Sequence, residues 1–200
     1  MTDQFAGMAD QLDSERESAG VHPLKFSLWL IIISIIMMFG AFTSAYIVRR
    51  AEGNWLEFNL PGILLITTGI IVLSSITMQL AYMAALRNNL ATLKLMLFLT
   101  LVLGIAFLVG QMNAWGELVQ NNIYFGGATS NPAGSFLYVL TGVHGFHLVT
   151  GLIYLLVVLM AAFKYKVHSK KMLRIQLCTI YWHFLGGLWI YLYIFLQVNH

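Results

Sequence analysis

Long stretches without any charged side chain dominate this sequence and limit what it can fold into. The 11 Lys and Arg and the 8 Asp and Glu residues of the 200-residue chain gather between apolar segments. A helix needs about 20 consecutive apolar residues to cross the hydrocarbon core of a bilayer, and several uncharged stretches are longer. Charged residues make up 10% of the chain, against roughly 25% in soluble domains. The sequence therefore predicts an integral membrane protein.

Five apolar segments are long enough to span a membrane, which predicts an all-α bundle of five transmembrane helices. The segments lie near residues 26–48, 62–86, 93–115, 134–163 and 174–197. Each of the three prolines, Pro23, Pro61 and Pro132, comes just before a segment, where a missing N–H costs least. Residues 23–200 are therefore predicted to form one five-helix membrane domain.

The first 22 residues differ from the rest in composition. They carry five acidic residues against the single Arg16 and contain no compact apolar run. A secretory signal needs a basic start followed by an apolar region, so we expect residues 1–22 to be a polar tail and not a cleaved signal.

Lys and Arg are distributed unevenly between the two predicted sides of the membrane. Nine lie in the N-terminal tail, the 87–94 turn and the 164–174 loop, and two, Arg49 and Arg50, lie on the other side. Cytoplasmic loops carry the excess of positive charge, which predicts a cytoplasmic N-terminus and a C-terminus outside. The net charge of +3 thus reports membrane orientation and gives no reason to expect nucleic acid as a partner. The basic residues of the 164–174 loop are candidate contacts to anionic lipid headgroups, although a topology signal alone also explains their presence. They are Lys164, Lys166, Lys170, Lys171 and Arg174.

Few polar side chains lie at depth in the predicted helices, and none of them is charged. Transporters usually keep acidic or basic groups near the midplane, so a small-solute channel or transporter is the weaker alternative. The lone Cys178 excludes a disulfide, an all-cysteine zinc site and an iron–sulfur cluster held by this chain alone. The polar residues predicted to form a cluster between helices are Gln111, His144, His147 and His183.

The histidines have two interpretations. His144 and His147 lie three residues apart and share a helix face, so either could pair with His183 of the next helix around a haem. Alternatively, Gly142 and Gly145 let the helices approach closely, and the imidazoles hydrogen-bond across the gap. Glycine crowding favours packing because a porphyrin needs space between helices, while haem ligation stays open as the alternative.

Three stretches of the sequence resemble a known family. They are "TGVHGFHLVTG" at 141–151, "YWHFLGGLWIYLY" at 181–193 and "LGIAFLVGQMNAWGEL" at 103–118. In order and spacing they are similar to the motifs of the subunit III family of haem–copper terminal oxidases, from about residue 24 to the end. The positions that match the family motifs, besides the histidines, are Thr141, Gly142, Gly145, Trp182, Phe184 and Glu117.

The resemblance implies a subunit of a bacterial inner-membrane oxidase, which reduces oxygen and translocates protons, and no catalytic or metal-binding residue in this chain. Haem and copper are expected in subunits I and II, with a small subunit IV or a larger respiratory supercomplex as further partners. This chain would stabilise subunit I, bind phospholipid and sustain turnover. The alternative is a haem-binding membrane anchor of another respiratory oxidoreductase.

Longer members of the family have seven spans, and this chain corresponds to the last five. The face left by the two absent helices is therefore expected to need another cover, either a partner helix or ordered phospholipid. The small and hydroxyl residues predicted to line this face are Gly40, Ser44, Thr67, Thr68, Ser74 and Ser75.

Overall fold

The computed structural model describes residues 23–56, 58, 60–127, 130–163 and 172–199, and five long helices account for most of them. The predicted all-α fold with five membrane-spanning helices is confirmed, and each predicted segment coincides with one helix. The polar tail predicted for residues 1–22 lies outside the described residues. The helices are α2 (Pro23–Ala51), α3 (Ile63–Leu86), α4 (Leu90–Gln120), α5 (Pro132–Phe163) and α6 (Leu173–Asn199).

All five helices are long and apolar enough to cross a membrane. The longest are α4 with 31 residues and α5 with 32. At about 1.5 Å per residue each exceeds a hydrocarbon core of about 30 Å. These two helices must therefore tilt or project beyond the core.

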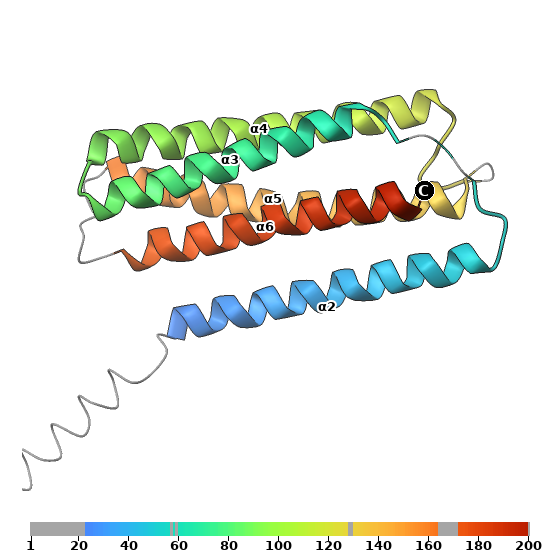
Figure 1. Cartoon of the computed structure of the whole chain (residues 1–200), viewed down its shortest axis with the longest axis horizontal. Helices are drawn as coiled ribbons and strands as arrows, with labels where there is room; N and C mark the ends of the chain where they lie inside the picture. The colour runs from blue at the N-terminus through green and yellow to red at the C-terminus, as the bar shows by residue number, and fades with distance from the viewer. Residues whose placement is uncertain (1–22, 57, 59, 128–129, 164–171, 200) are drawn as a thin grey trace, which may run out of the picture.

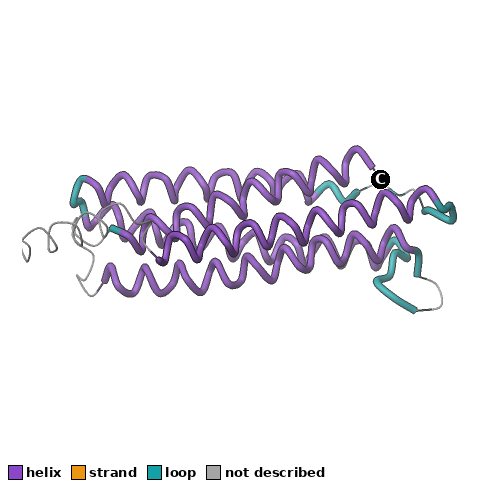
Figure 2. Tube along the Cα trace, turned by 90° about the horizontal axis from the view of Figure 1, so that it is seen from below, coloured by secondary structure: helices purple, strands orange, loops and turns teal. Residues whose placement is uncertain are grey.

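The helices lie side by side and alternate in direction (Figure 1, Figure 2). The start of α2, the α3–α4 turn, the end of α5 and the start of α6 lie at one end of the bundle, and the C-terminus lies at the other (Figure 1). Four of the described Lys and Arg residues, Lys25, Arg87, Lys94 and Arg174, therefore lie at one end, and the other two, Arg49 and Arg50, lie at the opposite end.

Asparagines define several helix boundaries. Asn88 adopts a φ of 53° between α3 and α4, a left-handed conformation that Asn tolerates better than most residues. Asn89 then caps α4, because its side chain accepts a hydrogen bond from the Thr92 N–H at 3.1 Å. At the opposite end, Asn131 accepts from the Ala133 N–H at 3.0 Å and donates to the Asn54 carbonyl at 3.2 Å. Asn131 thus ties the α2–α3 connection to the start of α5.

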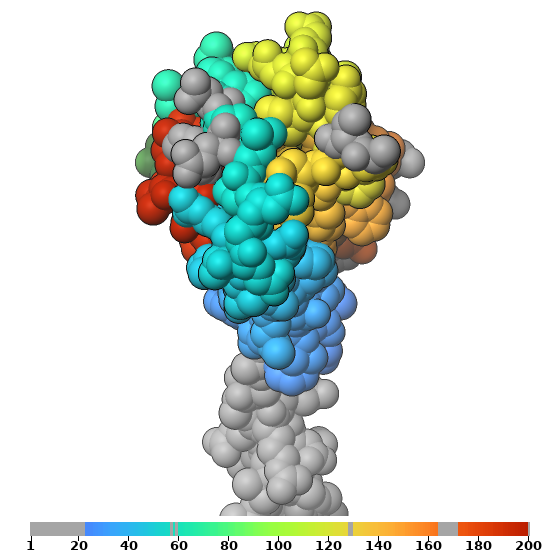
Figure 3. All heavy atoms as spheres, turned by 90° about the vertical axis from the view of Figure 1, so that its right-hand side faces the viewer, coloured from blue at the N-terminus to red at the C-terminus, as the bar shows by residue number. Residues whose placement is uncertain are grey.

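Burial divides the helices into a compact group of four and a more loosely attached α2. Of the five spans, α6 is the most buried and α2 the least. The buried side chains of α2 recur every three or four residues along one face, which lies against α5 and α6. The end-on view shows α2 standing out from the other four helices (Figure 3). Most of the surface of α2 is therefore left for lipid or a partner.

Glycines allow the closest helix contacts on α4. A Cβ added to Gly104 would lie 2.8 Å from side-chain atoms of both Leu152 and Trp182, and one added to Gly110 would overlap the Thr67 methyl group. Gly142 and Gly145, beside the histidines, have only ordinary contacts at 3.6 Å and 4.0 Å. The tight approach predicted at Gly142 and Gly145 is therefore wrong for these two residues. Gly151 at the end of the same motif and Gly186 of α6 do allow a close approach, since an added Cβ would lie 3.0 Å from Leu185 and 2.9 Å from Ser75 Oγ, respectively.

Candidate functional site

His144 lies in the centre of the four-helix group and is completely buried. Its ring packs against Trp189 of α6, with centroids 5.2 Å apart, and against Phe107 of α4 at 6.0 Å. Neither ring nitrogen has a hydrogen-bond partner within the described part of the chain. His144 therefore fills an aromatic core and forms no polar link between helices.

His147 faces a different neighbour. Its Nδ1 lies 2.8 Å from the carbonyl oxygen of Val143, one turn earlier on the same helix. Its ring contacts Phe39 of α2, with centroids 6.0 Å apart. The side chain is half-buried between α5 and α2. This histidine is thus fixed by its own helix and lies at the α2 interface.

His183 forms the one histidine hydrogen bond between helices that the described residues show. Its Nε2 lies 3.1 Å from Oε1 of Gln79 on α3, at the exposed edge of the bundle. The prediction of a single hydrogen-bonded cluster of His144, His147 and His183 is corrected. Residues three apart on a helix differ by about 60° in direction, which is enough for His144 to point inward and His147 toward α2.

Gln111 belongs to a second pattern, in which a hydroxyl group connects two helices. Its Nε2 donates to Thr67 Oγ1 at 3.1 Å, and the same hydroxyl donates to the Leu64 carbonyl of its own helix. Oε1 of Gln111 is buried and has no hydrogen-bond partner among the described residues. The residue therefore links α4 to α3, and the hydrogen bond that makes this link involves no histidine.

Three tryptophans, all within the motif stretches quoted above, follow the same pattern, although only Trp182 is singled out by position. The indole N–H of Trp182 donates to Ser74 Oγ at 3.1 Å, and that of Trp189 donates to Thr68 Oγ1 at 3.0 Å. Trp115 of α4 donates to Thr141 Oγ1 of α5 at 3.0 Å. Buried indole N–H groups usually find an acceptor. The sequence therefore indicates that these tryptophans donate hydrogen bonds, but it does not indicate which residues accept them.

The hydroxyl residues of α3 therefore have a role other than the predicted one. Thr67 and Ser74 are buried inside the bundle, and Thr68 is half-buried beneath Trp189. The prediction that they line an open face is wrong for these three residues. Gly40 and Ser44 of α2 are exposed, so that part of the predicted face is open.

The remaining motif and surface residues are scattered. Phe184 is half-buried, and Glu117 is exposed near the end of α4. Lys164, Lys166, Lys170 and Lys171, predicted to contact headgroups, lie outside the described residues. Arg174 is exposed, and its carbonyl accepts a hydrogen bond from Tyr154.

The described residues offer no group of three or more His, Cys, Asp or Glu side chains placed to hold a metal ion. Cys178 is a buried free thiol on α6. His144 packs against the aromatic rings of Phe107 and Trp189, and hydrogen bonds already use one ring nitrogen each of His147 and His183.

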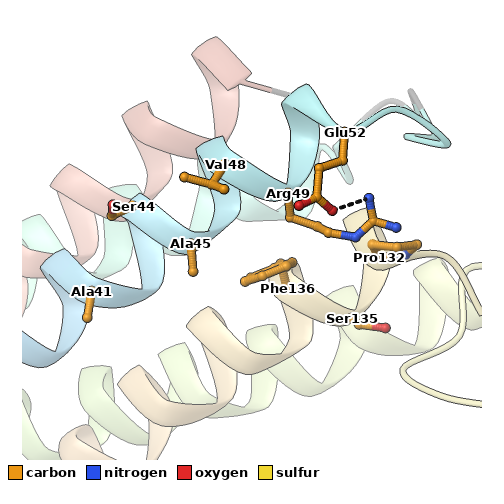
Figure 4. A pocket seen from close by; sticks show the side chains of 9 residues that line it. All are labelled: Ala41, Ser44, Ala45, Val48, Arg49, Glu52, Pro132, Ser135 and Phe136. Carbon is orange, nitrogen blue, oxygen red and sulfur yellow. Dashed lines mark ion pairs between the residues drawn. The ribbon is translucent and has the colours of Figure 1, made fainter.

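Two grooves run between α2 and the rest of the bundle. The first, of about 700 Å³, lies beside the end of α2 and is lined by the small side chains Ala41 and Ala45 and by Phe136 of α5 (Figure 4). Arg49 and Glu52 form an ion pair of 3.2 Å at its mouth (Figure 4). These features suit an apolar chain lying along the helix.

The second groove, of about 510 Å³, lies nearer the start of α2. It is formed by α2, α5 and α6 and includes His147, Thr150, Tyr154 and Tyr181. Thr150 and Tyr181 share a hydrogen bond of 3.0 Å across α5 and α6. Polar groups that open toward lipid at this depth are costly unless they have partners.

Comparison with known proteins gives one family for the whole length of the bundle. A family model described as cytochrome c oxidase subunit III matches residues 8–199. The chain is 30% identical to a cytochrome c oxidase subunit 3 of Corynebacterium diphtheriae over 198 residues, 94% of this chain and 95% of that protein.

Two further relatives carry different electron donors in their names, ubiquinol in one and cytochrome c in the other. A cytochrome bo(3) ubiquinol oxidase subunit 3 of Buchnera aphidicola is 28% identical over 179 residues, 87% of this chain and 93% of that protein. A cytochrome c oxidase subunit 3 of Synechocystis is 35% identical over 176 residues, 84% of this chain and 71% of its own length.

Proposed function

This chain belongs to the cytochrome c oxidase subunit III family, and we propose that it is the cofactor-free third subunit of a bacterial haem–copper terminal oxidase. The observation that carries this proposal is the family match over residues 8–199, which includes all five helices. The chain is a multi-pass protein of the bacterial inner membrane. Its five apolar helices and its bacterial relatives agree on this location.

The surroundings of the histidines support the absence of a haem in this chain. His144 is enclosed by Phe107 and Trp189, so a porphyrin beside it would have to displace packed rings. We infer that the haems and copper belong to subunits I and II, where oxygen reduction and proton translocation take place.

Helix α2 and its grooves support a stabilising, lipid-binding role. A largely exposed apolar helix beside two grooves offers surface to phospholipid and to subunit I. We propose that such contacts stabilise subunit I and sustain turnover. Arg174, together with Lys164, Lys166, Lys170 and Lys171, would contact lipid headgroups, and a small subunit IV or a larger supercomplex would be a further partner.

Affinity purification from native membranes tests the function. A tagged copy of this chain should recover haem-containing oxidase subunits, and deletion of the gene should reduce the stability of oxygen consumption during sustained turnover. Haem that remains bound to this chain after the other subunits are removed would contradict the proposal and favour a haem-binding anchor.

The orientation of the chain gives a separate prediction. We expect the N-terminus to be cytoplasmic because most Lys and Arg residues lie at that end. A cysteine introduced by Ser169→Cys should resist a membrane-impermeant thiol reagent applied to intact cells. The matched variant Gln120→Cys, at the exposed opposite end of α4, should react. The reverse pattern would invert the topology.

A further inference from the structure

The C-terminal half of α2 is tied to α6 by hydrogen bonds. The Tyr46 hydroxyl donates to the Asn199 carbonyl at 2.9 Å, and Thr43 Oγ1 accepts from the Tyr191 hydroxyl at 3.3 Å. Thr43 and Tyr46 are both buried, with 5% and 2% of their surface exposed. Two directional bonds, close together on one face of the helix, therefore hold this half of α2 in a fixed position on α6.

An aromatic cluster surrounds the same point. The ring of Tyr46 packs edge-on against Trp55, Phe195 and Phe136, with centroids 4.7, 5.1 and 5.7 Å apart. Trp55 follows α2, Phe195 belongs to α6 and Phe136 to α5, so the cluster joins three parts of the chain. Asn131 adds hydrogen bonds to the segment that follows α2. The chain is therefore anchored from several directions near Tyr46.

The N-terminal half of α2 is held differently. Its buried side chains are Ile32, Ile35 and Phe39, and the ring of Phe39 contacts that of His147 with centroids 6.0 Å apart. Within residues 28–40, the hydrogen bonds that the structure describes stay inside α2. Packing of apolar side chains and rings is therefore what holds this part of α2 against α5 and α6.

Apolar packing constrains a helix less in a membrane than in water. Lipid tails are as apolar as the side chains that they replace, so no hydrophobic driving force holds two helices together. When Ile32 and Ile35 leave α5 and α6, contacts with lipid replace much of what is lost. Segments with few fixed contacts open at the lowest free energy. The N-terminal half of α2 can therefore separate at a small cost, whereas the half at Tyr46 must break hydrogen bonds.

Separation leaves the opposite wall of the groove between α2, α5 and α6 intact. On this wall His147 Nδ1 is bonded to the Val143 carbonyl, Thr150 to the His147 carbonyl, and Tyr181 to Thr150. All of these partners belong to α5 and α6, so none of the bonds breaks when α2 moves. Ser34 of α2 also lines the groove, but it is already exposed and moves with its helix.

We propose that α2 is a hinged helix whose fixed point lies near Tyr46 and whose N-terminal half swings toward and away from α5 and α6. In the inward position Ile31 and Ile35 line the groove opposite its polar wall. In the outward position His147 and Thr150 become more accessible from the membrane, so the angle of α2 controls access to this wall. The hinge follows from contacts within the chain and goes beyond the proposed function, on which it does not depend.

The hinge predicts how far each part of α2 moves. At about 1.5 Å per residue, Val48 lies about 3 Å along the axis from Tyr46, and Phe26 lies about 30 Å from it. A rotation about Tyr46 therefore displaces Phe26 about ten times as far as Val48.

Pulsed electron paramagnetic resonance tests the hinge in the chain purified from native membranes with the subunits that accompany it. Spin labels are attached in a Cys178→Ala background to two pairs of exposed positions, each joining α2 to α6. One pair is Phe26→Cys with Arg174→Cys, and the other is Val48→Cys with Val198→Cys. We expect the distance distribution of the first pair to be at least about twice as broad, because label flexibility hides part of the tenfold difference in displacement.

A third pair separates swinging from fraying of the helix end. Ile36→Cys with Gly187→Cys labels exposed positions about 15 Å along α2 from Tyr46. A swing of the whole N-terminal half gives this pair an intermediate width. Broadening at Phe26 without broadening at Ile36 would show fraying and would overturn the hinge, as would equal widths for all three pairs.

A variant of the anchor locates the fixed point. Tyr46→Phe keeps the ring but removes the hydrogen bond to Asn199, so the distribution between labels at Val48 and Val198 should broaden. The matched control Tyr124→Phe removes a tyrosine hydroxyl from a loop hydrogen bond and should leave that distribution unchanged. If Tyr46→Phe also left it unchanged, the fixed point would not lie at Tyr46 and the proposal would be wrong.

Discussion

Replacing Gly110 by leucine is expected to force α4 away from α3 and to destabilise the bundle. The added Cβ would overlap the Thr67 methyl group of α3. The hydroxyl group of Thr67 also accepts the hydrogen bond from Gln111, which follows Gly110 on α4. Overpacking typically costs about 1–3 kcal/mol, and an interhelical hydrogen bond in a membrane contributes about 0.6 kcal/mol on average. Unfolding in mixed micelles by increasing fractions of a denaturing detergent measures the loss.

Gly69→Leu is the matched control. Gly69 lies on the exposed surface of α3, and a Cβ there meets nothing within 4 Å. Its free energy of unfolding should change by less than about 0.5 kcal/mol, as at most surface positions. If the two variants were equally stable, the close α3–α4 approach at Gly110 would be refuted.

The number and order of the helices could be predicted from the sequence because the bilayer leaves little choice. Backbone groups in hydrocarbon must be satisfied within the segment, so a long apolar stretch can only be a helix or part of a barrel. The predicted segment at 134–163 falls inside α5, Pro132–Phe163, because Pro132 precedes it and Lys164 directly follows its last apolar residue.

The inward faces of the helices could not be predicted in the same way. In a soluble helix the apolar face marks the core, but here the surface exposed to lipid is apolar too. Met37 is 70% exposed and Phe39 only 1%, although both are apolar. For the same reason the sequence predicts Thr67 and Ser74 on an open face, whereas they are buried and accept hydrogen bonds from other helices.

The histidines illustrate a second limit. Their spacing indicated a shared face on α5, but it could not indicate that Trp189 would fill the space beside His144 or that Phe39 would lie beside His147. Contacts between residues so distant in sequence depend on how the helices are rotated against each other. That rotation is determined by packing, to which steric details such as the glycines of α4 contribute.

Trp182→Ala is expected to destabilise the chain strongly. Trp182 is 1% exposed, and its ring lies against Gly104 of α4. Its indole N–H donates to Ser74 Oγ of α3 at 3.1 Å, so a single side chain of α6 contacts two other helices. Truncation of a buried tryptophan to alanine costs about 3–5 kcal/mol, and the same micelle unfolding experiment measures it.

A double-mutant cycle separates the hydrogen bond from the packing. Trp182→Phe keeps an aromatic ring but loses the N–H, and Ser74→Ala removes the acceptor. If the bond stabilises the bundle, the effects of the two changes are not additive, and the coupling should be near 0.6 kcal/mol and below about 2 kcal/mol. Additive effects would show that the hydrogen bond contributes nothing and that packing of the ring against Gly104 accounts for the whole loss. Wild-type stability of Trp182→Ala would contradict both contributions, and with them the position of α6 at the centre of the bundle.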